Sequence, residues 1–196
     1  PLAVAGVMVA VAGSAAGVGA YVDRTADRID VAVDGQHPGA AVMLSDQLDI
    51  PEYEVDPLPS LANAFDDRAQ VYFDGCHQGL TESELVMCDY GVAESDVTLM
   101  LVGGSHSAHW LPALELIAQT NDWRLISATK SACLFSSDPP GSGEERSSCM
   151  AWNEALLDAV VEESPDLVIM TATRGQGPDE HVPEGYTDMW RALEEH

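Results

Sequence analysis

Apolar runs and helical faces alternate along the later part of the chain. Runs of the buried-strand type occur at Val97–Val102, Trp123–Ala128 and Leu167–Ala172. Between them, Trp110–Gln119 and Met150–Glu163 carry apolar residues at helical spacing, which predicts two amphipathic helices. This alternation of strands and helices is typical of a parallel sheet covered on both faces. The sequence therefore predicts an α/β fold with a doubly wound parallel sheet.

The first 22 residues differ from the rest, because no charged residue interrupts them before Asp23. As a helix they would be about 33 Å long, which is enough to cross the hydrocarbon core of a bilayer. We expect a transmembrane helix over residues 1–22. The alternative is a secretory signal peptide, which should begin with Met and a basic region, whereas this sequence begins with Pro1.

Residues 23–70 are acidic and contain four prolines with little periodicity, which predicts a linker. Acidic residues after an apolar span fit the outer side of a membrane, since basic residues mark the inside. We therefore place the protein at the cell membrane, with residues 23–196 extracytoplasmic. Residues 71–196 would form the folded domain. It ends in an amphipathic helix, Tyr186–Glu195, after which an α/β fold needs another strand, so we expect this domain to be truncated.

The charge balance excludes two classes of partner. The chain has 33 acidic and 8 basic residues, and its formal net charge is −25. Nucleic-acid binding by phosphate neutralisation needs a basic surface, and so does docking on anionic lipid. Apolar residues still make up 46% of the chain, which is enough to build a core.

Four cysteines fall in the region that we place outside the cytoplasm. Sequence neighbours pair naturally, Cys76 with Cys88 and Cys133 with Cys149, although four cysteines allow three connectivities. Zinc binding is the alternative. It would favour short Cys-x-x-Cys spacings, and the sequence contains none.

A glycine-rich turn follows the first predicted strand and carries the candidate chemistry. It reads Gly103-Gly104-Ser105-His106-Ser107-Ala108-His109-Trp110. Ligands of open α/β sheets bind at the carboxyl ends of the strands, where a serine on such a turn exposes its hydroxyl. Backbone N–H groups at the start of the following helix can stabilise an oxyanion. Ser105 is thus placed as a nucleophile, with its own backbone N–H as the expected oxyanion donor. A plain turn or a phosphate cradle remains the alternative.

The same segment, LVGGSHSAHWLPAL, resembles the first block of the SGNH (GDSL-like) hydrolases. More closely, it resembles the SGNH domain that is fused to acyltransferase-family-3 membrane proteins, the bacterial O-acyltransferases of surface polysaccharides. Further matching segments fall in the family's order between residues 70 and 172. They are Tyr72–Cys76, Cys88–Gly91, Thr129–Cys133, Cys149–Asn153 and Pro165–Ile169.

This resemblance implies a serine-based O-acyltransferase with no cofactor and no metal. A membrane domain, whose last helix would be residues 1–22, would deliver the acyl donor. Ser105 would carry the acyl group, acetyl in our reading, as an ester and pass it to a carbohydrate hydroxyl. A membrane-anchored esterase that uses water as the acceptor is the alternative enzyme.

Two departures from the family pattern motivate a non-catalytic carbohydrate-binding domain as a further alternative. Gly104 stands where the family has Asp, and no Asp-x-x-His follows the serine, because Asp179 and His181 have the wrong spacing. We attribute the missing pair to truncation and expect the isolated 196-residue chain to be inactive.

Four other residues could contribute to the substrate site. His106 and His109 have the spacing of a metal pair, but no third ligand is evident. We expect His106 to pack behind Ser105 and His109 to face the pocket or the solvent. Lys130, the sole lysine, could face an anionic substrate, with a surface or carboxylate-paired position as the alternative. Arg174 lies just beyond the carboxyl end of the third predicted strand, which places it near the site by topology, with a solvated position as the alternative.

Overall fold

The computed structural model describes residue 37 and residues 55–175 and 177–195. The transmembrane helix predicted over residues 1–22 and most of the linker predicted over residues 23–70 lie outside this part of the chain. Among the helices that are described, none is both long and apolar enough to span a bilayer. The chain divides into two units, Pro1–Asp67 and Arg68–His196, and the second contains every named strand and helix.

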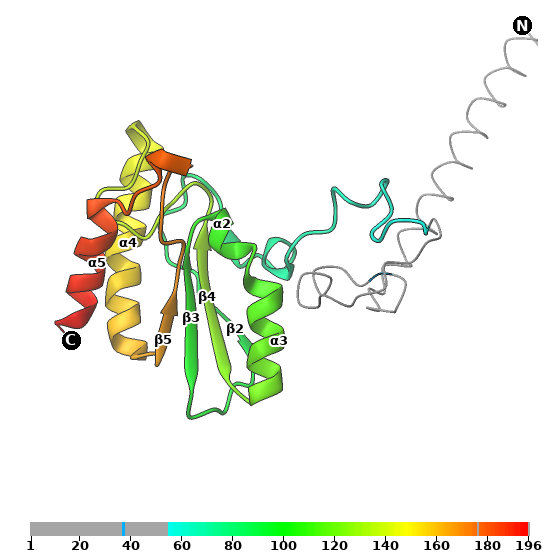
Figure 1. Ribbon diagram of the computed structural model, residues 1–196. Coiled ribbons are helices and arrows are strands. Elements are labelled where there is room, and N and C mark those ends of the chain that lie inside the picture. The colour runs from blue at the N-terminus through cyan, green and yellow to red at the C-terminus, as the bar shows by residue number, and fades with distance from the viewer. Residues whose placement is uncertain (1–36, 38–54, 176, 196) are drawn as a thin grey trace, which may run out of the picture. The chain divides into compact units, whose positions relative to one another are not determined.

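A five-stranded sheet forms the centre of the second unit (Figure 1). Four strands run parallel in the spatial order β1-β4-β3-β5, and β2 pairs antiparallel with β4. The strands are β1 (His77–Gln78), β2 (Cys88–Gly91), β3 (Thr98–Gly103), β4 (Arg124–Lys130) and β5 (Leu167–Ile169). The predicted doubly wound α/β fold is confirmed, and β1 and β2 are additions that the apolar pattern did not predict.

Helices cover both faces of this sheet. Figure 1 shows α3 on one face and α4 with α5 on the other. The opposite placement follows from the strand order. β3 connects to β4 on one side, whereas β4 connects back past β3 to β5, and right-handed crossovers in opposite directions place their helices on opposite faces. The helices are α2 (Ser105–Ala108), α3 (Leu111–Asn121), α4 (Gly143–Glu163) and α5 (Glu184–Glu194), with short 3₁₀ turns η2 (Gln70–Tyr72) and η3 (Gly177–Asp179).

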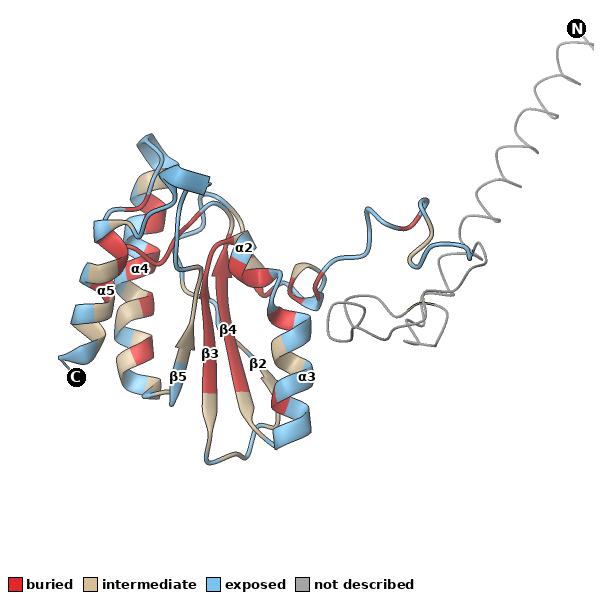
Figure 2. Ribbon diagram, in the orientation of Figure 1, coloured by how far each residue is buried: buried red, intermediate tan, exposed pale blue. Residues whose placement is uncertain are grey.

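Alternate residues of β3 pack into two separate hydrophobic cores, one on each face of the sheet. Leu99 and Leu101 pack toward the α3 side, and Met100 and Val102 pack toward α4. Figure 2 shows that β3 and β4 are buried over most of their length, as expected of parallel strands covered on both faces.

Two element boundaries differ from the predicted ones by three residues or more. The second long helix begins at Gly143 instead of Met150, because its first two turns are polar and show no apolar period. Two of these residues, Glu144 and Glu145, are acidic in the first turn, where the helix dipole favours negative charge. The third strand ends at Ile169 instead of Ala172, because only three of its residues pair with β3.

Both predicted disulfides are present, and they exclude a zinc site on these cysteines. Cys76 is bonded to Cys88 and Cys133 to Cys149, with Cα–Cα distances of 6.0 and 5.4 Å. Since β2 begins at Cys88, the first bond ties this antiparallel strand to the segment that leads into β1.

Candidate functional site

The turn after β3 sets the position of Ser105. Gly103 ends the strand with a φ of 116°, a conformation that glycine adopts without strain. A Cβ at Gly103 would also lie 2.9 Å from the hydroxyl oxygen of Ser107. Gly104 is the extended N-cap residue of α2, and Ser105 is the first residue of that helix. The strand therefore delivers Ser105 to the carboxyl edge of the sheet.

Ser105 lies in the wall of a hollow of about 180 Å³. Its side chain is partly exposed, and no hydrogen bond among the described residues involves its Oγ. The connections that follow β3 and β5 leave toward opposite faces of the sheet. Doubly wound folds bind ligands in the crevice between two such connections, at the carboxyl ends of the strands. The hollow occupies that crevice, since residues from both connections and from the loop after β4 line it. They are Gly104, Ser105, His106, Ala132, Leu134, Pro140 and Arg174.

A second hollow of about 480 Å³ adjoins the first and shares Leu134, Pro140 and Arg174 with it. Arg146 in its wall donates to the carboxylate of Asp138 at 2.5 Å and to the Pro139 carbonyl. The pattern of apolar positions did not identify these residues. The only sequence signal is the turn-forming run Pro139-Pro140-Gly141.

His181 and Tyr186 complete the wall of this larger hollow. The Nδ1–H of His181 donates to the Asp179 carbonyl at 2.9 Å, and its imidazole is not hydrogen-bonded to Ser105. Tyr186 is fully buried, and its hydroxyl has no partner among the described residues. The predicted helix Tyr186–Glu195 covered Tyr186, but its period did not show that the side chain would reach this hollow.

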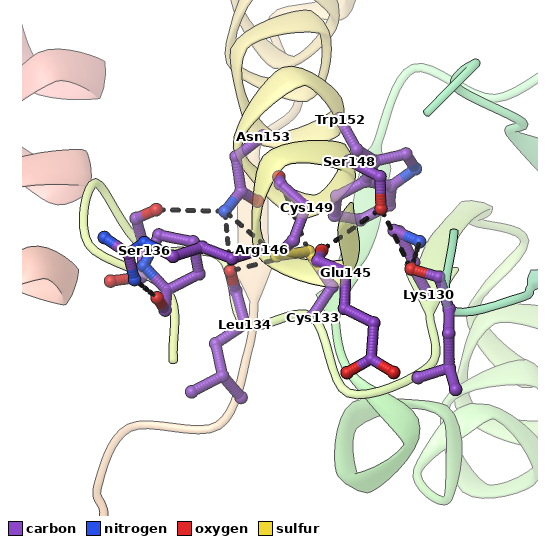
Figure 3. Close-up of a disulfide and its surroundings, with 12 residues drawn as sticks. Lys130, Cys133, Leu134, Ser136, Glu145, Arg146, Ser148, Cys149, Trp152 and Asn153 are labelled. Atoms are coloured by element: carbon purple, nitrogen blue, oxygen red, sulfur yellow. Dashed lines mark hydrogen bonds between the residues drawn. A yellow bond between two sulfur atoms is a disulfide. The ribbon is translucent and has the colours of Figure 1, made fainter. Parts of the chain in front are cut away.

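The loop that lines both hollows is held to α4 by a disulfide and a buried amide (Figure 3). Cys133 and Cys149 are both buried, and their bond joins the loop to the second turn of the helix. One turn further on, the Asn153 side-chain N–H₂ donates to the carbonyls of Leu134 at 2.7 Å and Ser136 at 2.9 Å. Asn153 is therefore a structural residue, which holds the loop to the helix.

Gly104, which stands where the resembled family has Asp, lies against this loop. A Cβ built on Gly104 would lie 3.1 Å from the Cys133 carbonyl oxygen. That contact is tight, and the carbonyl belongs to a disulfide-bonded residue. An Asp side chain here would require the loop to shift by a few tenths of an ångström.

The two histidines of the turn are both exposed. His106 lines the smaller hollow, so the expectation that it packs behind Ser105 was wrong. His109 lies one turn along, with its ring centroid 6.0 Å from that of His106. In the part of the chain that is described, no three His, Cys, Asp or Glu side chains are placed to hold a metal.

Lys130 takes neither of its expected positions. It is fully buried, and its ammonium donates to the carbonyls of Gly79 at 2.5 Å and Leu80 at 2.7 Å. Burial lowers the pKa of this amine, and the nearby carboxylate of Glu82 opposes the shift. Lys130 lines neither hollow, and its role is to anchor the segment between β1 and β2.

Arg174 lies in the wall of both hollows, and its backbone forms a bridge with His181. Trp110, the aromatic residue nearest in sequence to Ser105, is 61% exposed rather than part of the core. The reason is its position, since Trp110 is the N-cap residue that precedes α3. Trp152, by contrast, is buried and donates its indole N–H to the Gln78 side chain.

An Asp-x-x-His spacing does occur before the serine, at Asp74 and His77. It does not form a catalytic pair. The Asp74 carboxylate accepts from the Tyr90 hydroxyl at 2.6 Å. The two ring nitrogens of His77 are hydrogen-bonded to the hydroxyls of Thr129 at 2.9 Å and Ser131 at 3.1 Å. Burial, together with the charges of His109 and Lys130, lowers the pKa of His77.

The fold and the site define an α/β protein of the SGNH-hydrolase type, with a serine at the carboxyl edge of a doubly wound sheet. Comparison with protein families agrees, because the model described as "SGNH domain (fused to AT3 domains)" matches residues 62–195. This match covers more than half of the chain, and the chain belongs to that family. Searches of curated proteins and of solved structures found no match.

Proposed function

We propose that this chain contains the extracytoplasmic SGNH domain of a membrane O-acyltransferase, and that Ser105 carries the acyl group. The observation that carries this proposal is the position of Ser105, on a strand-to-helix turn beside a hollow in the crevice of the sheet. Membership in a family fused to AT3 domains supports the acyl-transfer role. An acetyl group, a polysaccharide acceptor and a location at the cell membrane are further parts of the proposal.

The proposed chemistry has two balanced steps. In the first, the Ser105 Oγ attacks the acyl carbonyl and loses its proton to a base. The bond from the acyl carbon to the donor breaks, and the departing donor group takes up that proton. In the second, a sugar hydroxyl attacks the serine ester and loses its proton, so that the acyl group becomes a sugar ester and Ser105 regains its hydroxyl. The Ser105 backbone N–H, at the first turn of α2, would stabilise the oxyanion in both steps.

A base is needed for both steps. Among the described residues, no imidazole is hydrogen-bonded to Ser105, and the sequence has no Asp-x-x-His after the serine. We propose that the His and Asp come from outside this sequence. The isolated chain is therefore expected to show no turnover, and a Ser105-dependent burst with an activated acetyl ester would contradict this expectation.

The decisive test replaces Ser105 in the cells that make the protein. Ser105→Ala should abolish O-acetylation of the surface polysaccharide, measured as acetyl content by proton NMR. Ser107→Ala is the matched control. It alters the same helix but removes a buried hydroxyl with no partner, so acetylation should persist. Unchanged acetyl content in the Ser105 variant would refute the proposal and favour the non-catalytic alternative.

The esterase alternative predicts a different result. The membrane-anchored esterase would release acetyl groups to water, so Ser105→Ala would raise the acetyl content of the polysaccharide instead of lowering it. The direction of the change therefore separates the two enzymes.

A further inference from the structure

Arg174 has no partner for its guanidinium among the described residues, although acidic residues outnumber basic ones four to one. The other arginines of the second unit all have partners. Arg124, Arg146 and Arg191 pair with carboxylates, and Arg68 lies over the rings of Tyr72 and Phe73. Arg174 instead lines both hollows and lies at the boundary that they share. A guanidinium in such a position can bind a carboxylate through two parallel hydrogen bonds.

Tyr186 supplies a second, independent observation. Its side chain is fully buried in the lining of the larger hollow, and its hydroxyl forms no hydrogen bond among the described residues. Leaving a buried hydroxyl without a partner is costly, and native proteins seldom do so. Its backbone is nevertheless fixed, because the Tyr186 N–H donates to the Pro183 carbonyl at 3.0 Å.

The rest of the lining combines apolar and polar groups. Leu134, Pro139, Pro140 and Pro183 provide apolar surface, and the neighbouring carboxylate of Asp138 is already paired with Arg146. The volume of about 480 Å³ is in the range of small-molecule sites. A sugar ring matches this lining, since it presents C–H faces and hydroxyls together.

From these observations we propose that the larger hollow binds the acceptor as a sugar unit that bears a carboxylate. Arg174 pairs with the carboxylate, and the Tyr186 hydroxyl bonds a ring hydroxyl. Because the smaller hollow contains Ser105 and shares Arg174, a sugar bound in this way has its neighbouring hydroxyls next to the serine. The assignment of this sugar as an acceptor rests on the proposed function, whereas the binding itself does not.

Binding can be tested on the full 196-residue chain in mild detergent. The probes are methyl β-D-glucuronide and methyl β-D-glucoside, which differ in the carboxylate, and binding is followed by ligand-observed NMR. We expect the glucuronide to bind at least about tenfold more tightly than the glucoside. Arg174→Ala should remove that difference, and Tyr186→Phe should weaken binding of both probes severalfold.

Arg191→Ala is the matched control, because it deletes the same charge from an exposed helix position. It should leave the preference within about twofold of the parent value. Equal binding of the two probes by the parent chain would overturn the proposal. So would equal effects of the two arginine variants, or competition by acetate as strong as that by the glucuronide.

Ser105→Ala separates this inference from the proposed function. The variant should bind the glucuronide as the parent does while abolishing acetylation in cells. Binding without any effect of Ser105→Ala on acetylation would refute the acyltransfer role and leave the sugar site standing. Loss of acetylation in the Ser105 variant, together with no glucuronide binding by the parent chain, would support the acyltransfer role and refute the sugar site.

Discussion

The bond between Cys133 and Cys149 should contribute more to stability than the bond between Cys76 and Cys88. The sequence separations are 16 and 12 residues, so loop-closure entropy alone assigns each bond about 3 kcal/mol. The two sulfurs of the longer loop are both buried, whereas Cys88 is only half-buried. Removing each buried sulfur should cost roughly 1 kcal/mol more in lost packing. We therefore expect about 5 kcal/mol for the Cys133→Ala/Cys149→Ala pair and about 4 kcal/mol for the other.

Urea unfolding followed by tryptophan fluorescence measures both losses of stability, because Trp152 lies on α4 and is buried in the core. The variants should lower the unfolding midpoint, with the larger decrease for the Cys133 and Cys149 pair. Amide hydrogen exchange adds a local signature, since residues 131–142 should exchange faster in that variant alone. A smaller loss of stability than in the Cys76 and Cys88 pair would refute the packing argument. Unchanged exchange in the loop would refute its anchoring role.

Two further predictions concern the buried amide of Asn153 and the half-buried imidazole of His77. Asn153→Asp replaces a donor to two carbonyls with an acceptor, so it should destabilise the domain by about 2 kcal/mol or more, and by more than Asn153→Ala in the same urea assay. An Asp variant as stable as the Ala variant would show that the amide is not needed as a donor. His77 has a folded pKa below its unfolded value of 6.5, so the folded state binds fewer protons. The free energy of unfolding should therefore decrease as pH falls below about 6.5, and His77→Gln should flatten part of that slope. Equal slopes for the two chains would refute this reasoning.

The sequence was most informative where contacts are local or repeat with a regular period. Three strands and three helices were predicted from apolar spacing, because a buried strand or helix face must be apolar whatever lies against it. The position of Ser105 was predictable for a similar reason. A strand followed by Gly103-Gly104-Ser105 and then a helix can only present the serine at the carboxyl end of the sheet.

The sequence could not reveal contacts between segments that are far apart in the chain. Lys130 looked like a surface or substrate residue, and its burial depends on carbonyls about 50 residues earlier, in an irregular segment. The strands β1 and β2 are short, and their pairing with β4 gives no apolar period of its own.

The candidate site likewise has one part that the sequence predicted and another that only the tertiary structure decided. The position of Ser105 was determined by the sequence, through the turn chemistry of glycine and the order of strand and helix. The surroundings of Ser105 were decided only by the tertiary structure. They combine a loop pinned by Cys133, a cation after β5 and a tyrosine from α5. The sheet brings these segments together at one edge, although they are far apart in the sequence. Contacts of this kind leave no local sequence pattern from which they could be predicted.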